Sequence, residues 1–113
     1  MRITGFDTVV VDFYRTNLVF VVLRTDEGLT GVAEATLEGQ EHAVQGAVRL
    51  LAEKVVGLDP TRIAETVYTL NRDAYWRGGP VTTTALSALE TAMWDVSAAR
   101  WACPSPALSL IHI

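Results

Sequence analysis

The distribution of apolar residues changes near residue 39, and this change constrains the fold more than any other feature of the sequence. Before it, β-branched and aromatic residues form short runs at 3–13, 18–25 and 29–36. After it, apolar residues recur every three or four positions, which is the spacing of an amphipathic helix. Three strands joined by short links predict an antiparallel meander. The expected fold class is therefore α+β, a three-stranded antiparallel meander followed by three helices.

Two of the expected strands carry a packing prediction. Residues 18–25 are nearly continuous apolar β-formers, which is typical of a central strand covered on both faces. In 29–36, Gly31, Ala33 and Ala35 share one face, and small residues there favour the close approach of a packed neighbour.

The helical part divides into three segments. The first helix is expected over 40–56, with Gly57 placed to end it. Asp59 suits the N-cap of the second helix and Pro60 suits its first turn. The third follows the break at Gly78-Gly79-Pro80 and runs to about Arg100. Its apolar face is so wide that we expect neighbours on more than one side.

Composition narrows the class of protein. The 113 residues suit a single domain, and with 50% hydrophobic and 19% charged residues the chain is not intrinsically disordered. A net charge of −4 argues against nucleic-acid binding, which needs a basic face. No secretory signal is visible, and the longest early apolar run, 18–23, is too short to span a membrane. The single cysteine fits a reducing compartment, so a cytoplasmic protein is expected.

Few residues are candidates for catalysis, metal binding or ligand binding, and none of them indicates catalysis. Cys103 lies between an alanine and a proline, which favours an incidental thiol, and His42 fits a solvated helix face better than a metal site. Residues 76–80, Trp-Arg-Gly-Gly-Pro, are either a structural turn or an anion site before a helix. The polar segment 14–17 lies beside strands that look buried, which is weak evidence of binding.

Four stretches resemble sequence motifs of one protein family. Residues 25–35 resemble its T-D-E-G-x-x-G-x-G-E hairpin, 57–60 its G-x-D-P helix start, 75–80 its Y-R-G-G-P word and 87–95 its S-A-(x)₄-A-L-W-D word. With them the chain resembles the N-terminal capping domain of the enolase superfamily, in the mandelate racemase and muconate-lactonizing enzyme branch. The Arg-Gly-Gly-Pro word looks most like galactonate dehydratase and related acid-sugar dehydratases.

The resemblance implies that this chain and a second domain have different roles within a larger enzyme. The reaction belongs to a following (β/α)₇β barrel, where carboxylates hold Mg²⁺ and a base removes the proton α to a carboxylate. The cap closes over the barrel mouth and contacts the distal part of the substrate through two loops, which correspond here to 14–17 and 36–40. The resemblance thus implies no catalytic residue and no metal ligand in this chain, an acid-sugar substrate bound with the missing barrel, and a homo-oligomeric parent.

The residues that the resemblance assigns to substrate binding lie in these two loops. They are Arg15, Thr16 and Asn17 in the first and Leu37 and Glu38 in the second. Arg15 and Asn17 are expected to hydrogen-bond sugar hydroxyls or a carboxylate. Trp76 and Arg77 are expected to reach either the substrate or the interface with the barrel.

The chain departs from the family in two places. Ala33 stands where the family has a tight glycine, and the family's Leu-Leu-Gly-Gly ending after Asp95 is missing. We therefore expect a capping domain over 1–101 and, over 102–113, an aberrant tail where the barrel should begin, as from a reading-frame or assembly break. Such a fragment of an acid-sugar dehydratase is expected to be inactive alone. The alternatives are the cap of a racemase or cycloisomerase of the same superfamily, or a free-standing small-molecule-binding or dimerisation module.

Overall fold

The computed structural model describes residues 1–12, 14, 16–72 and 78–101, and it has the predicted order of elements. Strands β1 (Ile3–Asp12), β2 (Asn17–Thr25) and β3 (Thr30–Glu34) form an antiparallel sheet in the order β1-β2-β3. Helices α1 (Glu41–Val55), α2 (Ile63–Arg72) and α3 (Pro80–Arg100) follow. The predicted α+β fold, a three-stranded meander followed by three helices, is confirmed for the described part of the chain.

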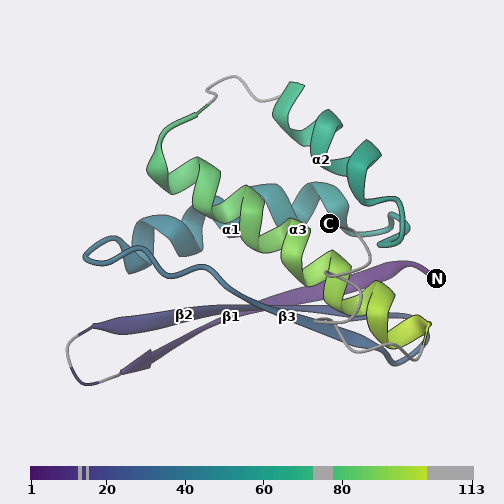
Figure 1. Cartoon of the computed structure of the whole chain (residues 1–113), viewed down its shortest axis with the longest axis horizontal. Coiled ribbons are helices and arrows are strands. Elements are labelled where there is room, and N and C mark those ends of the chain that lie inside the picture. The colour runs from purple at the N-terminus through teal and green to yellow at the C-terminus, as the bar shows by residue number, and fades with distance from the viewer. Residues whose placement is uncertain (13, 15, 73–77, 102–113) are drawn as a thin grey trace.

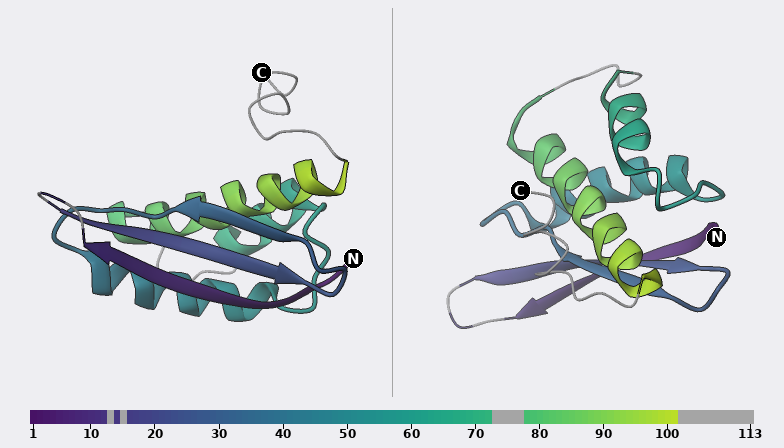
Figure 2. Two further views of the ribbon diagram at one scale, coloured as in Figure 1. Left: turned by 90° about the horizontal axis from the view of Figure 1, so that it is seen from below. Right: turned by 45° about the vertical axis from the view of Figure 1, so that its right-hand side comes forward.

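Helices α1 and α3 pack against a single face of the sheet, and α2 packs on these two helices and not on the strands, as Figures 1 and 2 show. On that face the side chains of Val19, Val21 and Leu23 in β2 are completely buried. On the opposite face Val9 and Val32 are each 47% exposed. The prediction that the central strand is covered on both faces is therefore wrong for the described residues.

Cross-strand pairing explains why β2 is apolar on its open face. Val9 lies opposite Phe20, Val11 opposite Leu18, and Val22 opposite Val32. Neighbouring apolar side chains on one face of a sheet shield each other, so a continuous apolar run does not require a second layer of structure.

Helix α3 contacts β3 and β2 on one side and α1 and α2 on the others, so it has the several neighbours that its wide apolar face predicts. It lies especially close to the sheet at Gly31, where an added Cβ would lie 2.2 Å from the Ala92 carbonyl oxygen and 2.5 Å from Val96 Cγ2. Ala33 and Ala35 are also buried on this face. The close neighbour predicted from these small residues is confirmed, and it is α3.

The start of α2 differs from the prediction. The helix begins at Ile63, and Thr66 donates its first backbone hydrogen bond to the Arg62 carbonyl. Asp59 Oδ1 instead accepts from the backbone N–H of Thr61 at 2.9 Å and from its hydroxyl at 2.7 Å. Because this side-chain turn satisfies Asp59 locally, the carboxylate stabilises the loop before α2 and does not cap the helix.

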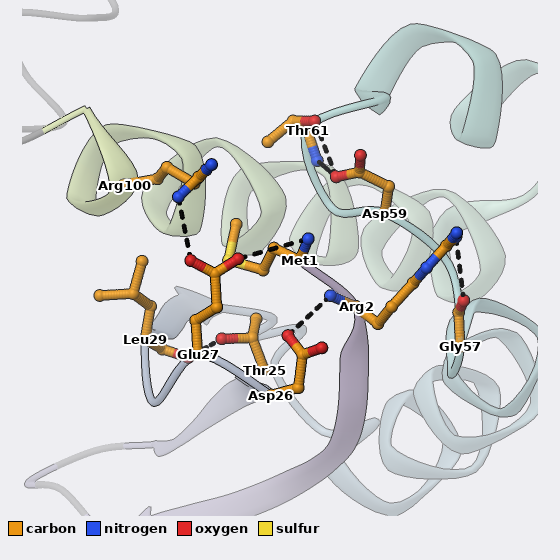
Figure 3. Close-up of polar contacts among 10 residues, drawn as sticks. All are labelled: Met1, Arg2, Thr25, Asp26, Glu27, Leu29, Gly57, Asp59, Thr61 and Arg100. Carbon is orange, nitrogen blue, oxygen red and sulfur yellow. Dashed lines mark hydrogen bonds and ion pairs between the residues drawn. The ribbon is translucent and has the colours of Figure 1, made fainter.

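The N-terminal residues are tied to three other segments (Figure 3). The Met1 ammonium lies 3.3 Å from Glu27, whose carboxylate also accepts from Arg100 at 2.9 Å. The Arg2 backbone N–H donates to Asp26, and its guanidinium donates to the Gly57 carbonyl. The Thr-Asp-Glu-Gly motif, which forms the β2–β3 turn, therefore has a structural role: it holds the N-terminus and the end of α3 together. Among the described residues, the helices are all too short or too polar to cross a membrane.

Candidate functional site

The two loops predicted to bind a ligand lie at the same end of the molecule, where β1 meets β2 and where β3 leads into α1 (Figures 1 and 2). Between them is a shallow hollow of about 420 Å³. The described residues that line it come from both loops and from the adjoining strand and helix ends: Asp12, Tyr14, Thr16, Asn17, Glu38, Gly39 and Glu41.

The first wall of the hollow is set by the β1–β2 pairing. Asp12 and Asn17 are register partners at the last position of the ladder, so the connection between the strands is short and its ends are fixed. Tyr14 is 87% exposed, whereas the Thr16 hydroxyl is buried and has no hydrogen-bond partner among the residues that the structure describes. An unsatisfied buried hydroxyl costs about 1–3 kcal/mol, which a ligand or a water molecule in the hollow would recover.

The second wall is held against β2 after β3 has ended. The Ala35 N–H donates to the Val19 carbonyl at 2.7 Å, and the Val19 N–H donates to the Thr36 hydroxyl at 3.1 Å. The chain then turns, with a hydrogen bond from the Gln40 N–H to the Leu37 carbonyl and with Gly39 at φ 77°. Both loops are therefore anchored on the same central strand, which fixes their separation.

The described lining of the hollow is acidic and rich in hydrogen-bonding groups. Asp12, Glu38 and Glu41 contribute three carboxylates, and hydroxyl and amide groups come from Tyr14, Thr16 and Asn17. Such a surface accepts hydrogen bonds from ligand hydroxyls and repels ligand anions. No three His, Cys, Asp or Glu side chains among the described residues are grouped so that they could hold a metal ion.

The predicted binding residues divide into three groups. Thr16, Asn17 and Glu38 line the hollow. Leu37 does not line it and instead packs, partly buried, against the hydrophobic core. Arg15, Trp76 and Arg77 lie outside the described residues, as does the tail over 102–113. The assignment of these residues to substrate binding stays a prediction.

Asp12 and Glu41 line the hollow without having been predicted as binding residues. Each belongs to a regular element, Asp12 to the last position of β1 and Glu41 to the first of α1. A prediction limited to loop residues leaves out the terminal residues of strands and helices, although their side chains can line the same hollow as the loops they flank. His42, in contrast, is exposed and hydrogen-bonds Gln45, as suits a residue on a solvated helix face.

Comparison with known proteins assigns the chain to a family. A model described as "Mandelate racemase / muconate lactonizing enzyme, N-terminal domain" matches residues 3–108. A D-mannonate dehydratase of Rhizorhabdus wittichii is 43% identical over 87% of this chain. A D-galactonate dehydratase family member of Pseudarthrobacter chlorophenolicus is 40% identical over 85% of the chain. The matched region is 24% of the length of each relative, so the chain spans about a quarter of these proteins.

Solved structures give the same assignment. An enolase of Pantoea ananatis with bound D-gluconate and magnesium has a TM-score of 0.83 and 35% identity, over 88% of this chain and 25% of that one. A member of the enolase superfamily from Salmonella Typhimurium has a TM-score of 0.84 and 27% identity, over 88% of this chain and 27% of that one. The resemblance read from the sequence is confirmed: the chain belongs to the mandelate racemase / muconate lactonizing enzyme family of the enolase superfamily and corresponds to its N-terminal domain.

Proposed function

We propose that this domain is the substrate-recognition lid of an acid-sugar dehydratase and that its acidic hollow binds the hydroxyl-bearing end of the sugar acid. The relatives named D-mannonate and D-galactonate dehydratase support this class of parent enzyme. In such a parent, abstraction of the proton α to the carboxylate and elimination of water take place in the part that this chain does not span. Dehydration is favoured over racemisation or cycloisomerisation because the relatives are named dehydratases.

The observation that carries the proposal is the meeting of both loops around one acidic hollow. Sugar hydroxyls donate hydrogen bonds to the carboxylates of Asp12, Glu38 and Glu41, and the Asn17 amide both donates and accepts. A substrate carboxylate about 4 Å from any one of these charges would be repelled by roughly 1–4 kcal/mol. The hollow therefore selects the orientation in which the substrate's carboxylate points away from the lid.

Among the described residues no three His, Cys, Asp or Glu side chains are grouped as ligands for Mg²⁺. The bound D-gluconate and magnesium of the Pantoea ananatis enolase support a magnesium-dependent parent. In the proposal the metal is held outside the described residues. The role of this chain is then limited to binding and orienting the substrate and to excluding water.

A chimera tests the proposal. Residues 1–101 replace the N-terminal domain of the Rhizorhabdus wittichii relative, and kcat/KM is measured over a panel of sugar acids. Glu38→Gln in the chimera removes one acceptor charge and should lower kcat/KM about tenfold for substrates whose hydroxyls reach it, mainly through KM.

Glu53→Gln is the matched control, since Glu53 is exposed on α1 and does not line the hollow. If Glu38→Gln and Glu53→Gln gave the same kcat/KM for every sugar acid, the hollow would not be a substrate-binding surface and the proposal would fail.

A further inference from the structure

A second cavity, of about 430 Å³, lies between the residue that precedes β1, the end of α1, the loop before α2 and one side of α2. It shares no lining residue with the hollow between the two loops. Its volume falls in the range of small-molecule sites, which run from about 300 to 1,000 Å³. The residues that line it are Arg2, Lys54, Leu58, Asp59, Arg62, Glu65, Thr66, Thr69 and Leu70.

This cavity is positive although the chain is acidic. Three of the nine Lys and Arg residues of the chain line it, against the two carboxylates of Asp59 and Glu65. The lining therefore has a formal charge of +1, whereas the whole chain has −4. The three cations come from three separate segments, so neither a helix repeat nor a run of basic sequence explains why they converge.

Most of the hydrogen-bonding capacity of these cations is unused within the described residues. Lys54 has no ion pair or hydrogen bond there, and the guanidinium group of Arg2 donates only to the Gly57 carbonyl, at 3.4 Å (Figure 3). Arg62 lies 3.5 Å from Glu65, in a pair whose side chains are both 69% exposed. Exposed pairs of this kind contribute little, and Arg62 has further donors in its planar guanidinium group.

The two carboxylates offset only part of the positive charge of the cavity, whose lining keeps a formal charge of +1. Asp59 directs one oxygen to Thr61, which donates to it twice, so this carboxylate is held in the loop and turned toward Thr61 (Figure 3). The positive end of the α2 dipole borders the cavity, because Arg62, Glu65 and Thr66 all belong to or precede the first turn of that helix. Leu58 and Leu70 add apolar wall, and the Thr66 and Thr69 hydroxyls add donors.

We propose that this cavity binds a small organic anion, whose carboxylate or phosphate group is held by Arg2, Lys54 and Arg62 and whose carbon skeleton lies against Leu58 and Leu70. The proposal is independent of the lid function, since the two sites share no residue: this cavity is positive and attracts anions, whereas the hollow between the loops is lined by carboxylates and repels them. Guanidinium and ammonium groups suit both kinds of anion, so the two are distinguished by titrating them separately.

The test is an NMR titration of the full chain with inorganic phosphate and, separately, with succinate, at constant ionic strength maintained with chloride. Lys54 is the only lysine of the chain, so its selectively labelled side chain gives one assigned signal inside the cavity. We expect a saturable shift of this signal in the millimolar range with at least one of the two anions, and the tighter of the two identifies the preferred group.

Arg62→Gln should weaken binding about tenfold, the effect of losing one charge-assisted hydrogen bond. Arg49→Gln is the matched control, because Arg49 is exposed on α1 and does not line the cavity; it should change the affinity less than twofold, roughly the screened effect of one distant surface charge. The proposal is overturned if the Lys54 signal does not saturate with either anion, or if Arg49→Gln weakens binding as much as Arg62→Gln.

Discussion

Gly31 is a position at which the packing of helix α3 on the sheet can be tested with one methyl group. In Gly31→Ala the new Cβ would lie 2.2 Å from the Ala92 carbonyl oxygen, and real Cβ atoms keep at least 3.0 Å from such neighbours. The helix and strand must therefore separate by at least about 0.8 Å, since the oxygen belongs to the backbone and cannot rotate away. Overpacking of this kind costs about 3 kcal/mol.

The matched control is the same substitution at Gly46. This residue is exposed inside α1, and an added Cβ there would meet nothing within 4 Å. Gly46→Ala should raise the free energy of unfolding by about 1 kcal/mol, because alanine is the better helix former. Identical chemical changes are thus expected to act in opposite directions, with a difference of about 4 kcal/mol.

Urea unfolding followed by tryptophan fluorescence measures both variants, with the m-value as a check that the transition stays comparable. The reasoning is refuted if Gly31→Ala unfolds at the same urea concentration as the unmodified chain, or if both variants shift in the same direction. The first result, or a gain of stability in Gly31→Ala, would mean that α3 does not lie against β3 as described, whereas a loss of stability in Gly46→Ala would mean that the site in α1 is not a neutral control.

Three further substitutions test individual polar groups. Ser97→Ala should raise the free energy of unfolding by about 1 kcal/mol, because the Ser97 hydroxyl is buried with no hydrogen-bond partner in the described structure; thermal unfolding measures this, and a loss of stability would contradict it. Asp95→Ala should lower it by about 1 kcal/mol, since the Asp95 carboxylate accepts from the Val32 N–H at 2.9 Å, and unchanged denaturant unfolding would show that this bond contributes nothing. The backbone N–H and then the hydroxyl of Thr61 lower the pKa of Asp59 below its ordinary 3.8, so the stability that this carboxylate contributes is present above that pH and is lost on further acidification. Asp59→Asn should therefore reduce the fall in the free energy of unfolding below about pH 4, measured by urea unfolding at several pH values. An equally steep fall in this variant would contradict the prediction.

The order of elements was predictable because each part of the sequence has one clear periodicity. The small residues Gly31, Ala33 and Ala35 even indicated a close neighbour, which is α3. Local rules failed where two explanations compete for one residue. Asp59 satisfies both the pattern of a helix cap and that of a side-chain turn, and the hydrogen bonds to Thr61 decide for the turn.

The candidate site was only partly predictable. The family resemblance named the two loops, but the sequence does not say that Leu37 points to the core or that Asp12 and Glu41 complete the hollow. These placements depend on how Val19 in β2 anchors the segment after β3, which is a contact between residues far apart in the chain.

The most direct test of the lid function is the experimental structure of the chimeric dehydratase with a sugar acid bound. If the domain is a lid, hydroxyls at the end of the substrate away from its carboxylate hydrogen-bond Asn17 and Glu38, at about 2.6–3.2 Å. A bound sugar acid that contacts neither loop, or one whose carboxylate lies in the acidic hollow, would contradict it.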